Sequence, residues 1–168
     1  MDIIFSKKLI FKLIGVVVTF MAFIFVCCYA TSAKNQLDVG YALLNNKKVA
    51  LEIASDPHSR EIGLMYRDSL AENKGMIFIF DKSDEVGFWM KNVRIPLDML
   101  FVSHSKIVKV EKDVPICKND PCSVYTSDAA VDSVIELKDG FCDKYNIKAG
   151  QTIEFSPNIQ KQISKIYN

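Results

Sequence analysis

A run of five apolar residues, Met76–Phe80, constrains the fold of this 168-residue chain more than any other feature. Four of the five residues are β-branched or aromatic, which favours a strand. Because every position is apolar, such a strand must be covered by protein on both of its faces. We therefore expect a central strand inside a domain with its own hydrophobic core.

Shorter segments with strand character surround this run. In the segment 49–53, Val, Leu and Ile alternate with Ala and Glu, as in a strand with one buried face. Five further strands are predicted, at Gly87–Lys91, Asp98–Ser103, Lys106–Lys112, Ala130–Leu137 and Thr152–Phe155. The fold class is therefore mostly β (α+β), a compact seven-or-so-stranded β-sandwich or barrel with one short docked helix.

The docked helix is predicted to follow Asp56 and Pro57. Aspartate accepts amide hydrogen bonds as an N-cap, and proline fits the first helical position. We expect the helix to reach Met65, with Gly63 in its interior at a cost of up to about 1 kcal/mol relative to alanine. Glycine at this position indicates close packing. A second short helical stretch is expected at Phe141–Tyr145.

Two of the strands are close enough to form a hairpin around His104 and Ser105. Neither residue is glycine or asparagine, so a two-residue turn is expected to be strained, and a longer turn is the alternative. With the turn at these residues, Asp98 would face Glu111. Opposed carboxylates arise in acid/base pairs that share a proton. A neighbouring cation that neutralises Asp98, or a turn-capping role for it, is the preferred explanation, so no catalytic dyad is predicted.

The first 33 residues have the layout of a secretory signal. Three lysines precede an unbroken apolar run, Leu13–Cys28, and small and polar residues follow it. This run is shorter than the roughly 18–20 residues that span a bilayer. We predict a signal peptide or membrane anchor at 1–33, with membrane attachment through residues 9–30 as the second case. The domain at 34–156 is then exported, periplasmic or extracellular, and the tail 157–168 is expected to fray.

Three cysteines lie in the predicted exported domain. Cys117 and Cys122 enclose a turn-forming stretch that contains Pro121, so they can approach within bonding distance, and an oxidising compartment favours the bond. We predict a Cys117–Cys122 disulfide, with Cys142 as a buried free thiol. A bridge from Cys142 to one of the other two is the alternative.

Composition excludes several classes of protein. With 21 Lys and Arg against 20 Asp and Glu, no basic field indicates nucleic-acid binding. The thiols and the two histidines lack the spacing of a zinc site, so neither a metal nor a cofactor is expected.

Four motifs in fixed order give the chain a family resemblance. They are Arg60–Arg67, Gly75–Phe80, Phe88–Asn92 and Ile95–Phe101, followed by Tyr125, Glu136, Leu137 and Gly140. Over residues 37–156 the chain resembles the domain-of-unknown-function family number 192, also called uncharacterised protein family 0127. The resemblance implies a small exported or membrane-tethered bacterial or archaeal domain of compact β-rich fold with no established activity. Two residues depart from the family pattern: Val93 stands where relatives usually have threonine, and Ser105 where they usually have glycine.

The candidate ligand-binding residues are Arg60, Arg67, Trp89, Lys91, Asn92 and Asp98. Trp89 and Lys91 would share a strand face that could stack a sugar or clasp a carboxylate, and Arg60 and Arg67 would share a helix face that could bind an anion. The alternatives are a simple core or rim tryptophan, a solvated lysine and carboxylate-paired arginines.

No complete set of catalytic residues appears in the sequence. We therefore favour an exported non-catalytic binding or accessory module for an unknown small molecule or protein. One alternative is a hydrolase- or lyase-type enzyme that uses Asp98 and Glu111 with a basic residue. Another is a membrane-tethered partner-binding domain.

Overall fold

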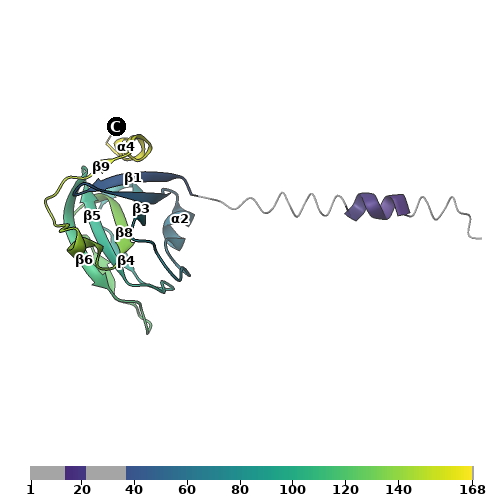
Figure 1. The fold of residues 1–168 in the computed structure, drawn as a ribbon, viewed down its shortest axis with the longest axis horizontal. Helices are drawn as coiled ribbons and strands as arrows, with labels where there is room; N and C mark the ends of the chain where they lie inside the picture. The colour runs from purple at the N-terminus through teal and green to yellow at the C-terminus, as the bar shows by residue number, and fades with distance from the viewer. Residues whose placement is uncertain (1–13, 22–36, 168) are drawn as a thin grey trace, which may run out of the picture. The chain divides into compact units, whose positions relative to one another are not determined.

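The computed structural model describes residues 14–21 and 37–167 (Figure 1). Residues 14–21 are helical, and no helix within these described ranges is long and apolar enough to cross a membrane. The predicted signal or anchor segment lies mostly outside the described residues. The second of the two compact units of the chain, Leu37–Asn168, contains all the strands of the described residues.

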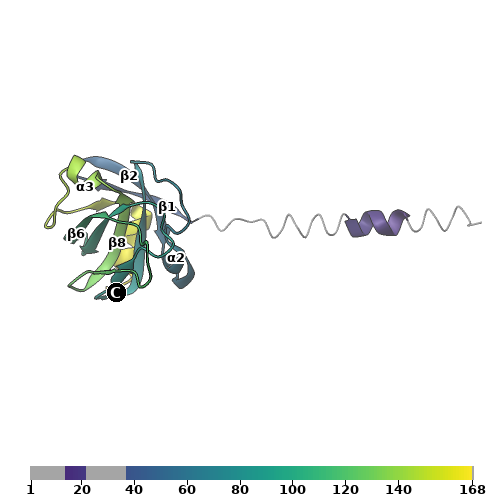
Figure 2. The same cartoon turned by 90° about the horizontal axis from the view of Figure 1, so that it is seen from below.

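This unit is built on a curled seven-stranded sheet with the order β6-β5-β8-β3-β2-β1-β9, seen from two directions in Figures 1 and 2. Its strands are β1 Val39–Leu44, β2 Lys47–Ala54, β3 Lys74–Asp84, β5 Leu97–Ser103, β6 Lys106–Val114, β8 Val131–Lys138 and β9 Glu154–Phe155. A second, two-stranded sheet pairs β4 Gly87–Trp89 with β7 Val124–Thr126. The short helices of the unit are α2 Pro57–Ile62, α3 Phe141–Lys144 and α4 Pro157–Ser164. The predicted mostly-β class is confirmed.

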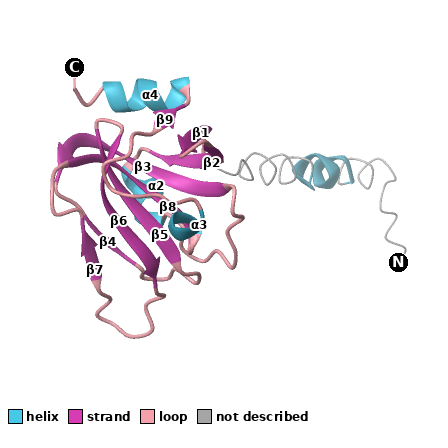
Figure 3. Ribbon diagram, turned by 60° about the vertical axis from the view of Figure 1, so that its left-hand side comes forward, coloured by secondary structure: helices cyan, strands magenta, loops and turns pink. Residues whose placement is uncertain are grey.

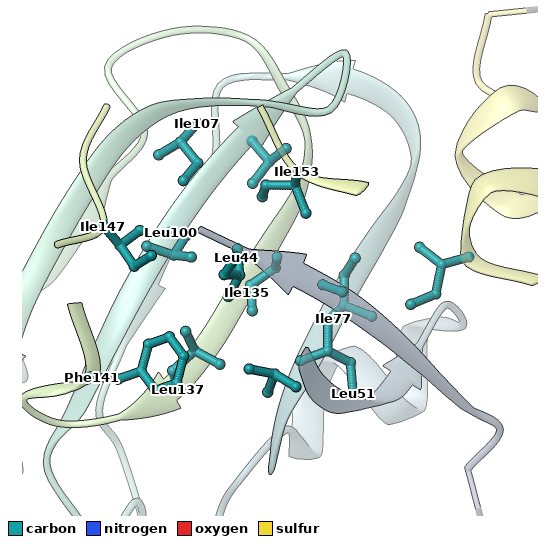
Figure 4. Packing of buried hydrophobic residues seen from close by; sticks show 14 of the residues in the cluster. Leu44, Leu51, Ile77, Leu100, Ile107, Ile135, Leu137, Phe141, Ile147 and Ile153 are labelled. Atoms are coloured by element: carbon teal, nitrogen blue, oxygen red, sulfur yellow. The ribbon is translucent and has the colours of Figure 1, made fainter. Parts of the chain in front are cut away.

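Strand β3 lies at the centre of the large sheet and is covered on both faces, as its apolar run predicts. Ile77 and Ile79 point into a first core, whose side chains from β5 and β8 include Leu100 and Ile135 (Figure 4). Met76 and Phe78 alternate with them and point into a second core on the other face. The sheet therefore separates two packed layers.

The second core is covered by the small sheet. Phe88 of β4 packs edge-on against Phe78, with ring centroids 5.0 Å apart, and against Phe101 at 6.2 Å. Met90 is buried in the same layer. This contact fixes β4 over the middle of the large sheet, where it forms one wall of the site described below.

Helix α2 begins as predicted but ends earlier. The Asp56 side chain accepts a hydrogen bond from the Ser59 amide at 3.0 Å, which completes a capping box. The helix stops at Ile62, because Gly63 has a φ of 49° and a Cβ there would lie 3.1 Å from the Phe78 ring. The expectation that the helix reaches Met65 is therefore wrong, and Gly63 allows a tight approach to β3.

The β5–β6 hairpin does turn at His104 and Ser105, and both residues adopt positive φ values of 51° and 59°. The longer turn is therefore not needed. The pairing then changes register between Val102 and Phe101, and Glu111 lies opposite Met99. Such an irregularity shifts every later pair, so the predicted opposition of Asp98 to Glu111 is wrong.

The tail after Pro157 is ordered rather than frayed. It forms α4, which lies beside β9 and β1 (Figure 3). Ile159 and Ile163, four residues apart on one helical face, are buried in the first core. A Cβ on Gly40 of β1 would lie 2.6 Å from the Ile159 side chain, so glycine permits this close packing.

The predicted disulfide is present between Cys117 and Cys122, which lie five positions apart. Closing so short a loop restricts the unfolded chain only modestly, so we expect its reduction to lower the free energy of unfolding by about 2 kcal/mol. Urea unfolding with and without reductant measures this difference. A Cys117→Ala/Cys122→Ala variant should match the reduced protein, whereas complete unfolding on reduction would contradict a merely local clip.

Candidate functional site

A row of directly paired residues crosses the large sheet through five strands. In order from β2 to β6 it contains Glu52, Met76, Glu136, Met99 and Glu111. Directly paired residues on neighbouring strands point to the same face. Glu136 of β8 therefore lies between two methionines on the face of the second core.

The Glu136 carboxyl is nearly buried and has no partner. The residue is only 4% exposed, and it makes no hydrogen bond or ion pair among the described residues. No fully buried side-chain oxygen in this part of the chain lacks a partner, so the carboxyl oxygens retain some accessible surface. Burial raises the pKa of this carboxyl from 4.5 to about 8, although the positive charge of Arg67 opposes the rise. Glu136 is thus uncharged at neutral pH.

A cleft of about 40 Å³ opens above Glu136. It lies between β4 and the segment that runs from α2 into the following turn, and its apolar walls include Leu64, Phe78, Phe88 and Val93. A single water needs at least about 10–15 Å³, so the cleft admits two or three waters or the head of a small organic group. The arrangement is a largely apolar slot lined by two carboxylic acids, the nearly buried Glu136 and the exposed Glu61.

Trp89 forms part of the rim of this cleft. It is 50% exposed, while its neighbours Phe88 and Met90 turn inward, as strand alternation predicts. The Lys91 ammonium lies 5.4 Å from the centre of the Trp89 ring and 3.5 Å from a carboxylate oxygen of Asp120. Asn92 is exposed, and its side-chain amide lies 3.7 Å from the sulfur of Met65.

The two candidate arginines are each held by a different carboxylate. Arg67 donates two hydrogen bonds to Glu52, of 2.5 and 2.7 Å, and these bonds lower the pKa of Glu52. Arg60 bonds the Ile79 carbonyl and Asp81. Because the helix ends before Arg67, the arginines do not share a helix face. Of the two, only Arg60 lines the cleft.

Asp98 lies outside the cleft. Adjacent strand residues point to opposite faces, so Asp98 points away from the second core, in which Met99 is buried. Its two carboxylate oxygens accept hydrogen bonds from the backbone amides of Asp113, at 2.9 Å, and Cys142, at 2.7 Å. Glu111 instead pairs with Lys109. The structure therefore separates the two carboxylates on which the alternative enzyme hypothesis depends.

The structure thus brings Arg60 and Trp89 together at the cleft, with Lys91 on the Trp89 ring and Asn92 behind Met65. In the sequence, Glu136 is singled out only as part of the family resemblance. A lone acidic residue near the end of an apolar strand is a further pattern that could have indicated a site residue. Within the described residues, no group of three or more histidine, cysteine or acidic side chains could hold a metal ion.

Cys142 is a free, buried cysteine. Burial, together with the nearby charge of Asp98, raises the pKa of its thiol. We expect iodoacetamide at pH 8 to leave Cys142 unmodified in the folded protein and to alkylate it after unfolding in urea. Peptide mass mapping reads this position separately from the other cysteines. Rapid labelling in the folded state would contradict its burial.

The fold and the cleft above Glu136 define a small β-rich domain with a compact candidate site. A family profile described as "Uncharacterized ACR" (DUF192) matches residues 41–155, and the chain belongs to this family, as its motifs predict. The description of the profile names no activity, so membership identifies no reaction or ligand. A search of curated proteins gave no match.

Two crystal structures resemble the chain. One, from Sinorhizobium meliloti 1021, carries the provisional description of a transcription regulator; it shares 29% identity and a TM-score of 0.68, covering 73% of this chain and 98% of its own. The other is a protein of unknown function from Novosphingobium aromaticivorans, with 24% identity and a TM-score of 0.65, covering 73% and 89%. The second likeness concerns the fold alone.

Proposed function

We propose that this protein is an exported binding module whose ligand site is the cleft above Glu136. The observation that carries the proposal is a nearly buried carboxyl that borders the cleft without a hydrogen-bond partner from the described residues. Buried polar groups in proteins are nearly always paired, because an unpaired one destabilises the fold. A ligand that enters the cleft would supply the missing partner.

Export is supported by two independent features. The amino-terminal segment has the layout of a secretory signal or anchor. The Cys117–Cys122 disulfide suits an oxidising compartment. The provisional description of the Sinorhizobium relative is not carried over, because the balanced charge of this chain offers no basis for binding DNA.

A second candidate function is an enzyme in which Glu136 transfers a proton. It is favoured by the pKa of about 8, which suits a general acid or base at neutral pH. The cleft lining, however, holds no serine, cysteine or histidine that could act as a nucleophile beside Glu136. The binding module is therefore the better supported of the two.

The test is a panel of four three-carbon probes: propylamine, propanol, propionamide and propionate. Each is titrated into the full-length, isotope-labelled chain in a non-ionic detergent, and NMR follows the Trp89 indole and the Gly63 amide. We expect at least one probe to shift both signals saturably, and Glu136→Gln to weaken that binding at least tenfold. Glu154→Gln, at an exposed acid, is the matched control. Failure of all four probes would contradict the proposal.

A further inference from the structure

We propose that the ligand of this cleft is a primary alkylammonium group, the end of a lysine side chain or of a free aliphatic amine, which binds Glu136 as a carboxylate beside the Trp89 ring. This inference rests on the proposed function, since it names the ligand chemistry of the same site. Three features support it: the charge balance around the cleft, the size and lining of the cleft, and the isolation of the carboxyl.

The charge balance around the cleft favours a cation. Each nearby basic side chain already has a carboxylate partner: Arg60 with Asp81, Arg67 with Glu52, and Lys91 with Asp120. Two acids line the cleft, Glu61 and Glu136, and neither makes an ion pair within the described part of the chain. An incoming anion would meet the unpaired Glu61 and would oppose the ionisation of Glu136, whereas a cation would favour the charged form of both acids.

The size and lining of the cleft favour an ammonium head on an alkyl stem. A volume of about 40 Å³ accommodates an NH₃⁺ group and one or two methylenes. The faces of aromatic rings attract cations, and Trp89 and Phe88 border the space. The apolar walls suit the methylenes, as they suit the stem of a lysine.

The hydrogen-bonding capacity of Glu136 suits the same ligand. A carboxylate accepts hydrogen bonds and an ammonium only donates them, so the two groups satisfy each other. None of the described residues competes for the carboxyl, because Arg67 is committed to Glu52. Pairing the carboxylate with an ammonium offsets part of the free-energy penalty that burial imposes on its charge.

Binding should be coupled to the release of a proton. The Glu136 carboxyl is uncharged below about pH 8, so a cation that pairs with it must displace its proton. The charged groups around it are Arg60 and Glu61 at α2 and Arg67 in the turn after α2, whose charge acts on its pKa. Two strands away in the same row of the sheet lie Glu52 on β2 and Glu111, paired with Lys109, on β6. Its direct partners on β3 and β5 are Met76 and Met99, and Phe88 of β4 lines the cleft with it. On the same face of β3, the cation Lys74 lies two residues before Met76.

The experiment titrates propylammonium chloride into the full-length chain in a non-ionic detergent. Trp89 is the only tryptophan of the chain, so its fluorescence reports the cleft. We expect the affinity to rise about tenfold per pH unit between pH 6 and 7 and to level off above pH 8, because the ligand stays charged to about pH 10. Calorimetry in two buffers of different ionisation enthalpy should show about one proton released at pH 6.

Variants and analogues sharpen the result. Glu136→Gln should abolish the pH dependence and weaken binding at least tenfold, while Glu154→Gln should change neither. Propyltrimethylammonium has the same charge but no N–H donor and a larger head, so it should bind at least tenfold more weakly. Equal binding by this quaternary ion would overturn the proposed contact with Glu136.

Further outcomes identify the source of the ammonium group and show which of the two proposals fails. Tighter binding of Nα-acetyl-lysine methylamide than of propylammonium supports a protein lysine as the natural ligand, and the reverse order supports a free amine. Binding of propionamide alone, weakening as the pH rises, would overturn the ammonium proposal and leave the cleft a binding site. Absence of binding by every probe would contradict the proposed function itself.

Discussion

Glu136→Gln is expected to raise the free energy of unfolding by about 3 kcal/mol at pH 7 and to leave it nearly unchanged at pH 4. The carboxyl has a pKa of about 8 in the folded protein and an ordinary value of 4.5 when exposed. Between these values the folded state holds a proton that the unfolded state releases, so stability falls as the pH rises. Glutamine is never ionised and removes this loss. Urea unfolding at pH 4, 7 and 9 measures the difference.

Glu52→Gln is the matched control on the same sheet row. The hydrogen bonds from Arg67 lower the pKa of Glu52, so its charge stabilises the fold above its ordinary pKa of 4.5. That stability is lost as the pH falls through the lowered value, the opposite dependence to Glu136. A Glu136→Gln protein less stable than wild type at pH 7 would show that the carboxylate has a stabilising partner.

Asp98→Asn is expected to lower the free energy of unfolding by about 3 kcal/mol, without changing ligand binding at the cleft. Both carboxylate oxygens of the buried Asp98 accept hydrogen bonds from backbone amides. Asparagine offers one acceptor oxygen and turns an NH₂ group toward the other amide, which leaves two donors facing each other.

Glu111→Gln provides the comparison for Asp98. It removes an ion pair with Lys109 in which both side chains are partly exposed, so we expect a loss below about 1 kcal/mol. Urea unfolding gives both values, and the Trp89 titration reports binding. Normal stability of Asp98→Asn together with lost binding or activity would contradict a purely structural role and restore Asp98 as a site residue.

The parts of the fold predicted correctly from sequence are those fixed by local pattern. The apolar run in β3 predicts its central place in the sheet, because a strand that is apolar on both faces must be covered by protein on both faces. Asp56 and Pro57 predict the start of α2 for an equally local reason, the capping of free amides. Likewise, the short spacing of Cys117 and Cys122 predicts their disulfide.

The errors arise where distant packing overrides local pattern. Ile159 and Ile163 do have helical spacing, but only their burial against the sheet makes α4 stable, and so short a helix has little stability of its own. Strand β7 has three residues and is held by its pairing with β4. The change of register in the β5–β6 hairpin lies within strands whose sequences look regular. A prediction that assumes uninterrupted pairing therefore places Asp98 opposite Glu111, which is wrong.

The candidate site was predicted only in part for the same reason. Trp89 and Arg60 are chemically conspicuous in the sequence, and both lie at the cleft. The isolation of Glu136 depends on what packs above it, namely β4 and the turn after α2, and on the commitment of Arg67 to Glu52. Those contacts join segments far apart in the chain, so spacing alone could not reveal them.

The most direct measurement of the central claim is the ionisation of Glu136 itself. The side-chain carboxyl carbon of glutamate, labelled with ¹³C, shifts on ionisation, and Glu136→Gln assigns its signal. We predict a midpoint at about pH 8 for Glu136 in the free protein, with a fall toward ordinary glutamate values when propylammonium is bound. A midpoint near 4.5 in the free protein would contradict the claim, because the carboxylate would then already be solvated or paired.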